Sequence, residues 1–71
     1  MYMSITLDGI DYKSKSDKIS DEDFKNASEK LYQNIGDLAS MHMELENGDT
    51  FIIGKDAVQK AVIILHKEET K

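Results

Sequence analysis

Two dipeptides, Asp8-Gly9 and Asn47-Gly48, constrain the fold of this chain more than any other feature. Both combinations tolerate the positive φ angles that tight hairpin turns require. Apolar and polar residues alternate before each dipeptide, as they do in strands that bury one face. The sequence therefore predicts two antiparallel hairpins.

The first hairpin has a register that gathers apolar side chains on one face. If its loop has two residues, Leu7 lies opposite Ile10, and Ile5 lies opposite Tyr12. The polar residues between them then lie on the other face, as a half-buried pair of strands requires. In the second hairpin the returning strand, 50–53, is apolar at three successive positions.

Between the hairpins, the sequence predicts a helix over about residues 20–35. Ser20 can cap the free amides at its start, and Asp23 stands where a capping box needs an acceptor. Gly36 is a plausible end. Apolar residues recur at helical spacing and form one stripe, which consists of Phe24, Ala27, Leu31 and Ile35.

The last segment has two interpretations. Asp56 and Gln59 could cap a helix that continues to Leu65, but Val62–Ile64 is a β-branched run that favours a strand. We prefer a helical turn at 56–60 followed by a strand at 61–66, with 67–71 as a frayed tail.

These elements predict an α+β fold in which one helix packs on a small, mainly antiparallel sheet, in the order β-β-α-β-β-β. The 71 residues form a single domain, 1–71, with no cysteine for a disulfide. A chain this small buries little surface, so its core comes from ordinary apolar side chains or is shared with another subunit. Closure of the strands toward a small barrel is the alternative arrangement.

The strands at 50–53 and 61–66 offer apolar side chains to both faces, whereas one helix covers only one face of a sheet. We therefore expect the second face to be an interface, most simply with a second copy. The alternative is that a hairpin folds over the second face. The expected protein-interface residues are Phe51, Ile53, Ile63 and Leu65.

The charge pattern argues against nucleic acid as a partner. The net charge is −5, and all nine basic residues are lysines, which lack the planar fork of arginine. An acidic domain can imitate DNA, although here the acids are interspersed with lysines. Capping and the helix dipole account for part of the acidity.

No residue pattern indicates catalysis, a metal site or a cofactor. His42 shares one side of its strand with Glu44 and Glu46, but metal sites need three or four convergent ligands at suitable spacing. His66 ends the last apolar strand, where a hydrogen-bonded boundary histidine is the ordinary reading. We expect no catalytic residue, no metal, no cofactor, no small-molecule substrate and no enzymatic activity.

Two resemblances are carried by short stretches. The segment 43–65 (MELENGDTFIIGKDAVQKAVIIL) resembles small proteins of Gram-positive phages and mobile elements. Glu46-Asn47-Gly48 is similar to the first motif of Sm-like barrels. The second Sm motif, with its RNA contact, is missing, so no RNA-binding residue is carried over. An Sm-like RNA binder is our third reading.

We expect a non-enzymatic protein-interaction module that self-associates through its sheet as a homodimer or binds a host protein. A phage or mobile-element accessory role is the expected context. The alternative is an acidic DNA mimic that inhibits a host nucleic-acid-binding enzyme. No apolar run reaches the ~20 residues that span a bilayer, and the N-terminus lacks a signal pattern, so the expected location is cytoplasmic.

Overall fold

The computed structural model describes residues 1–68. The elements are β1 (Tyr2–Leu7), β2 (Ile10–Lys13), α1 (Asp21–Asn34), a 3₁₀ turn η1 (Ile35–Asp37), β3 (Ser40–Glu44), β4 (Thr50–Gly54), α2 (Lys55–Lys60) and β5 (Val62–His66). The predicted α+β class and element order are confirmed, including the helical turn before the last strand. Of the tail expected at 67–71, residues 69–71 lie outside the described part.

The first hairpin has the predicted register. Leu7 lies opposite Ile10, and Ile5 lies opposite Tyr12. Asp8 and Gly9 have φ angles of 52° and 82°, the pair of positive values that a type I′ turn needs. Local turn chemistry thus sets the pairing of β1 with β2.

The second hairpin is confirmed, but its loop is a three-residue loop. Leu45 lies where the turn begins, and its carbonyl accepts a 2.9 Å hydrogen bond from Gly48 N. Its own N–H donates to Asp49 O at 2.7 Å. Gly48 has a φ of 93°, so the loop is a type I turn followed by a left-handed glycine. Asn47 accepts a bond from Asp49 N at 2.9 Å through its side-chain oxygen.

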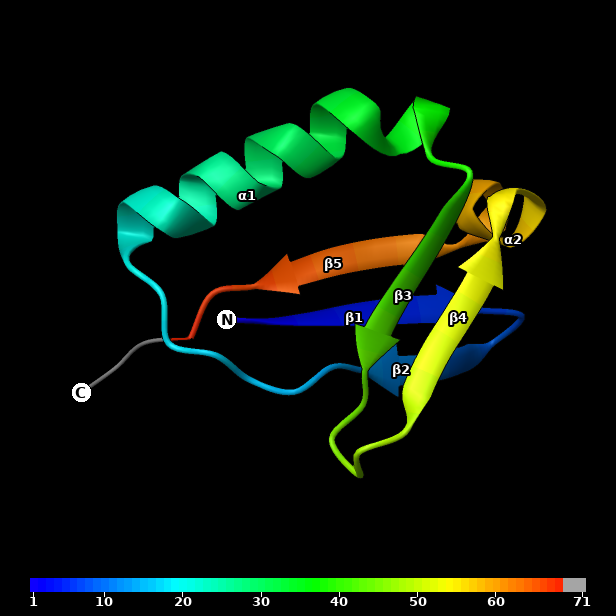
Figure 1. Ribbon diagram of the computed structural model, residues 1–71, viewed down its shortest axis with the longest axis horizontal. Helices are drawn as coiled ribbons and strands as arrows, with labels where there is room; N and C mark the ends of the chain where they lie inside the picture. The colour runs from blue at the N-terminus through cyan, green and yellow to red at the C-terminus, as the bar shows by residue number, and fades with distance from the viewer. Residues whose placement is uncertain (69–71) are drawn as a thin grey trace.

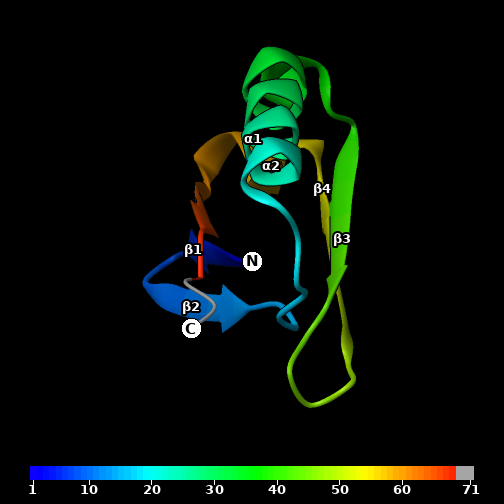
Figure 2. The same ribbon diagram turned by 90° about the vertical axis from the view of Figure 1, so that its left-hand side faces the viewer.

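The strands form two sheets, whereas we expected one. One sheet has the order β2-β1-β5, and the other contains β3 and β4. An isolated bridge between Ser14 and Leu45 joins them at one corner. In the described residues both sheets are open, so they do not close into a barrel. Figure 2 shows them facing each other, which is the alternative in which a hairpin folds over the second face.

The core lies between the two sheets and is small. Ile5 on β1 is fully buried, and Val58 on α2 is 2% exposed. Met43 and Ile53 complete the buried cluster from β3 and β4. α2 therefore places a core side chain at one end of the two sheets.

Helix α1 begins as the sequence predicts, with Ser20 Oγ accepting a hydrogen bond from Asp23 N at 3.1 Å. The helix is followed directly by the 3₁₀ turn η1, so helical backbone extends to Asp37, one residue beyond Gly36. Figure 1 shows α1 running alongside β5, on the side away from β1. None of its residues is buried. The helix is therefore amphipathic but only loosely packed.

Replacing Ile5 tests the position of the core. Ile5→Ala should lower the free energy of unfolding by about 2–5 kcal/mol, because it leaves a cavity between the sheets. The measurement is urea denaturation followed by circular dichroism. Ile10→Ala is the matched control, since Ile10 lies in the same hairpin but is 56% exposed. Equal losses for the two variants would contradict this account of the core.

Candidate functional site

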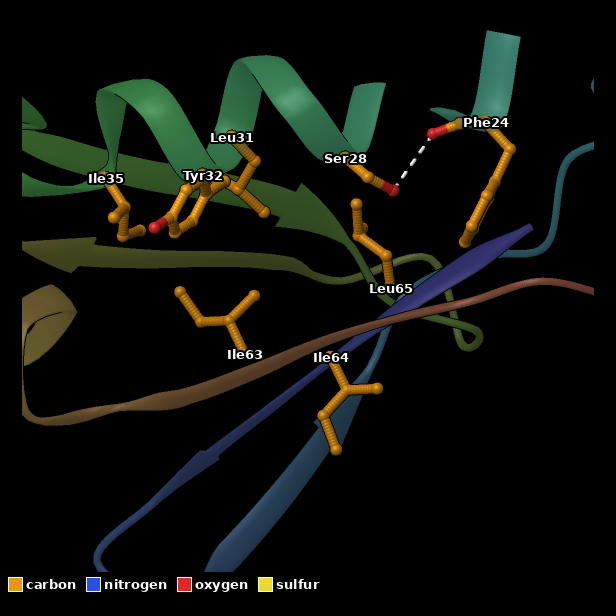
Figure 3. Close-up of a pocket in the computed structure, with 8 residues that line it drawn as sticks. All are labelled: Phe24, Ser28, Leu31, Tyr32, Ile35, Ile63, Ile64 and Leu65. Atoms are coloured by element: carbon orange, nitrogen blue, oxygen red, sulfur yellow. Dashed lines mark hydrogen bonds between the residues drawn. The ribbon is translucent and has the colours of Figure 1, made fainter. Parts of the chain in front are cut away.

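The main concave feature of the described residues is an apolar groove between α1 and β5, with a volume of about 480 Å³ (Figure 3). Such a volume is in the range of ligand and partner sites. Its walls come from the apolar side of α1 and from three successive residues of β5. The lining residues are Phe24, Ser28, Leu31, Tyr32, Ile35, Ile63, Ile64 and Leu65.

The two walls of the groove differ in how they present side chains. Ile63 and Leu65 point from β5 toward α1, whereas Ile64 points away from the helix (Figure 3). Tyr32 is 80% exposed, the highest value among the large apolar residues. The groove therefore has an aliphatic floor and a prominent aromatic ring on its helical wall.

Side-chain contacts hold α1 at its two ends. Gln59 Nε2 on α2 donates to Ile35 O at 3.2 Å, just after the helix. Lys67 Nζ, just after β5, lies 3.1 Å from Asp21 Oδ1 in the first turn of α1. The groove runs between these two attachments.

The backbone of β5 contributes polar groups to the groove. Ser14 N donates to Met3 O at 2.9 Å, so the backbone groups of Met3 point toward β2. The backbone N–H and C=O groups of successive residues in a strand point in alternate directions. The groups of Ser4 therefore point toward β5, where Ser4 lies opposite Ile64. The N–H and C=O groups of Ile63 and Leu65 must then point to the free edge of β5.

The polar side chains of the groove are few. Ser28 Oγ donates to Phe24 O at 2.9 Å, so this hydroxyl bonds within the helix. Tyr32 contributes its hydroxyl at the groove wall. The groove can therefore bind an apolar surface that also offers backbone or hydroxyl hydrogen-bonding groups.

The residues expected at the interface lie partly in or against the core and partly in the groove, which Ile63 and Leu65 line. Ile53 is 8% exposed in the core cluster, and Phe51 and Ile63 pack against that cluster. Leu65 is half-buried and lines the groove. The apolar side chains that these two strands leave exposed are the alternate ones, Ile52, Val62 and Ile64.

The sequence predicted the stripe of α1 but did not identify Phe24, Leu31 and Tyr32 as site residues. We treated the stripe as core, because apolar residues at helical spacing usually pack against a sheet. Tyr32 lies beside Leu31 and widens the stripe on one side. This aromatic residue next to the stripe was the sequence feature that could have indicated a binding surface on the helix.

His66 takes part in a small cluster on the three-stranded sheet. Its Nε2 lies 2.8 Å from Ser4 Oγ, and its ring stacks on Tyr2 with centroids 4.2 Å apart. Ser4 is buried at the centre of β1, and within residues 1–68 His66 makes no hydrogen bond to a carboxylate. The cluster therefore acts as a cross-strand link between β1 and β5. His42 is exposed on β3, opposite Ile52.

The described residues contain no group of three or more His, Cys, Asp or Glu side chains placed to hold a metal ion. Within the same range, every helix is too short or too polar to cross a bilayer. Comparisons with protein-family models, with curated proteins and with solved structures found no match. The site must therefore be interpreted from its own geometry.

Hydrogen exchange tests the backbone pattern of the groove. In dilute solution the amides of Ile63 and Leu65 should exchange much faster than that of Ile64, because only the Ile64 amide is bonded to β1. The measurement is amide exchange followed by NMR. Slow exchange at Ile63 together with fast exchange at Ile64 would contradict this assignment, because it would mean that the Ile63 amide, and not the Ile64 amide, is bonded to β1.

Proposed function

We propose that this chain is a non-enzymatic protein-interaction module and that the groove between α1 and β5 is its binding surface. The observation that carries this proposal is the groove itself, an apolar volume of about 480 Å³ beside a helix with no buried residue. A soluble chain gains free energy when such a surface is covered.

The polar groups in the groove support a polypeptide as the partner. A small-molecule site usually has a few convergent polar side chains that fix the ligand. Here the edge of β5 offers the N–H and C=O groups of Ile63 and Leu65 next to apolar walls. Another protein can supply complementary hydrogen-bonding groups together with an apolar surface.

The placement of the acidic groups supports this function over DNA mimicry. Asp21 pairs with Lys67 at 3.1 Å, and Glu44 pairs with Lys15 at 2.9 Å. A DNA mimic needs a row of unopposed negative charges at phosphate-like spacing. These two acids are instead partly neutralised by neighbouring lysines.

Photo-cross-linking tests the proposed surface. Tyr32 is replaced by the photoreactive residue p-benzoylphenylalanine, which keeps an aromatic ring at the groove. Irradiation of host lysate containing this variant should give a discrete protein adduct, identified by mass spectrometry, because the partner covers the groove. The adduct should be absent without irradiation.

The same probe at Gln33 is the matched control. Gln33 is the next residue on α1, about 100° further round the helix, and is exposed. It should give no adduct. The proposal is overturned if the probe at Tyr32 yields no protein adduct, or if the two positions give the same pattern.

A further inference from the structure

We infer that the groove is occupied by a second copy of this chain, in a twofold-symmetric dimer in which Tyr32 of each copy enters the groove of the other. The inference rests on the proposed function, since it names the partner for the same surface. It follows from the exposed area of the chain, its dimensions and the position of Tyr32.

The exposed area is larger than a compact monomer of this size should have. The chain exposes 5359 Å² for a mass of 8.1 kDa. The usual scaling gives about 4,500 Å² at that mass. The surplus of roughly 850 Å² is close to the ~800 Å² that each partner buries in an interface of standard size.

The dimensions of the molecule lead to the same conclusion. The radius of gyration is 12.3 Å, whereas about 11 Å is expected for a compact chain of this length. Within residues 1–68 the buried apolar cluster is limited to Ile5, Met43, Ile53 and Val58. A domain this small with so little core gains the missing burial most directly from a copy of itself, which is always present at equal concentration.

The surface is suited to a symmetric contact because it carries both a projection and a recess. Tyr32 projects from α1 with 80% of its area exposed, and it lies at the wall of the groove that it would fill in a partner. A twofold axis places Tyr32 of each copy at the groove of the other copy. The tyrosine hydroxyl, which needs a partner when buried, can donate to a free carbonyl of Ile63 or Leu65.

Sedimentation equilibrium of the purified full chain tests the dimer. Across the micromolar to millimolar range, the average mass should rise from 8.1 kDa toward twice that value. Tyr32→Lys should raise the dimer dissociation constant by about thirtyfold or more, the effect of losing an aromatic hot spot. Tyr32→Ala should weaken the dimer in the same direction, and both variants should keep the native circular dichroism because Tyr32 is exposed.

Ile52→Lys is the matched control, since Ile52 is 71% exposed on β4 and lies outside the groove. Its dissociation constant should equal that of the unmodified chain. A chain that stays at 8.1 kDa throughout, or a dimer disrupted by Ile52→Lys and not by the Tyr32 variants, overturns the inference. An adduct at Tyr32 with a different protein, from a monomeric chain, would sink the dimer and leave the protein-interaction function standing.

Discussion

The packing of Ile5 between the two sheets is the interaction on which the rest of the structure depends. Ile5 lies on β1, the central strand of its sheet, and is fully buried. Met43 and Ile53 meet it from the facing hairpin, and Val58 meets it from α2. One apolar cluster thus joins both hairpins to the C-terminal helical turn. α1 contributes no residue to this cluster, and of its stripe only Ile35, just after the helix, packs against it, which leaves Phe24 and Leu31 to line a groove.

Much of the local structure could be predicted from the sequence, because the responsible interactions are local. Asp8 and Gly9 adopt the positive φ angles of the turn, and Ser20 caps its helix. The β-branched run before His66 forms a strand. The relation between the sheets was left open between two alternatives, since it depends on contacts between residues far apart in the chain. Alternation along a strand identifies two faces but does not say which one is covered.

The expected interface residues divide between the core and the groove. Ile53 and Ile63 were chosen because they are apolar and lie on apolar strands. The folding of one hairpin over the other sheet buried Ile53 and left Ile52 exposed, whereas Ile63 is half-buried and lines the groove. The groove depends on how far α1 stands from β5, and the contacts at the two ends of the helix, at Asp21 and after Asn34, join residues far apart in the chain. Helical periodicity contains no information on that spacing.

The pairing of β1 with β5 also has a consequence during synthesis. Tyr2 lies opposite His66, so the central strand of the sheet is made before all the other described elements and its second partner, β5, is made after them. Val58, which covers Ile5, is also made late. Until α2 and β5 are made, the nascent hairpin of β1 and β2 has one strand edge and its main apolar face uncovered. The three-stranded sheet can therefore be completed only after β5 has left the ribosome, and chaperones that shield nascent strands can act on the hairpin until then.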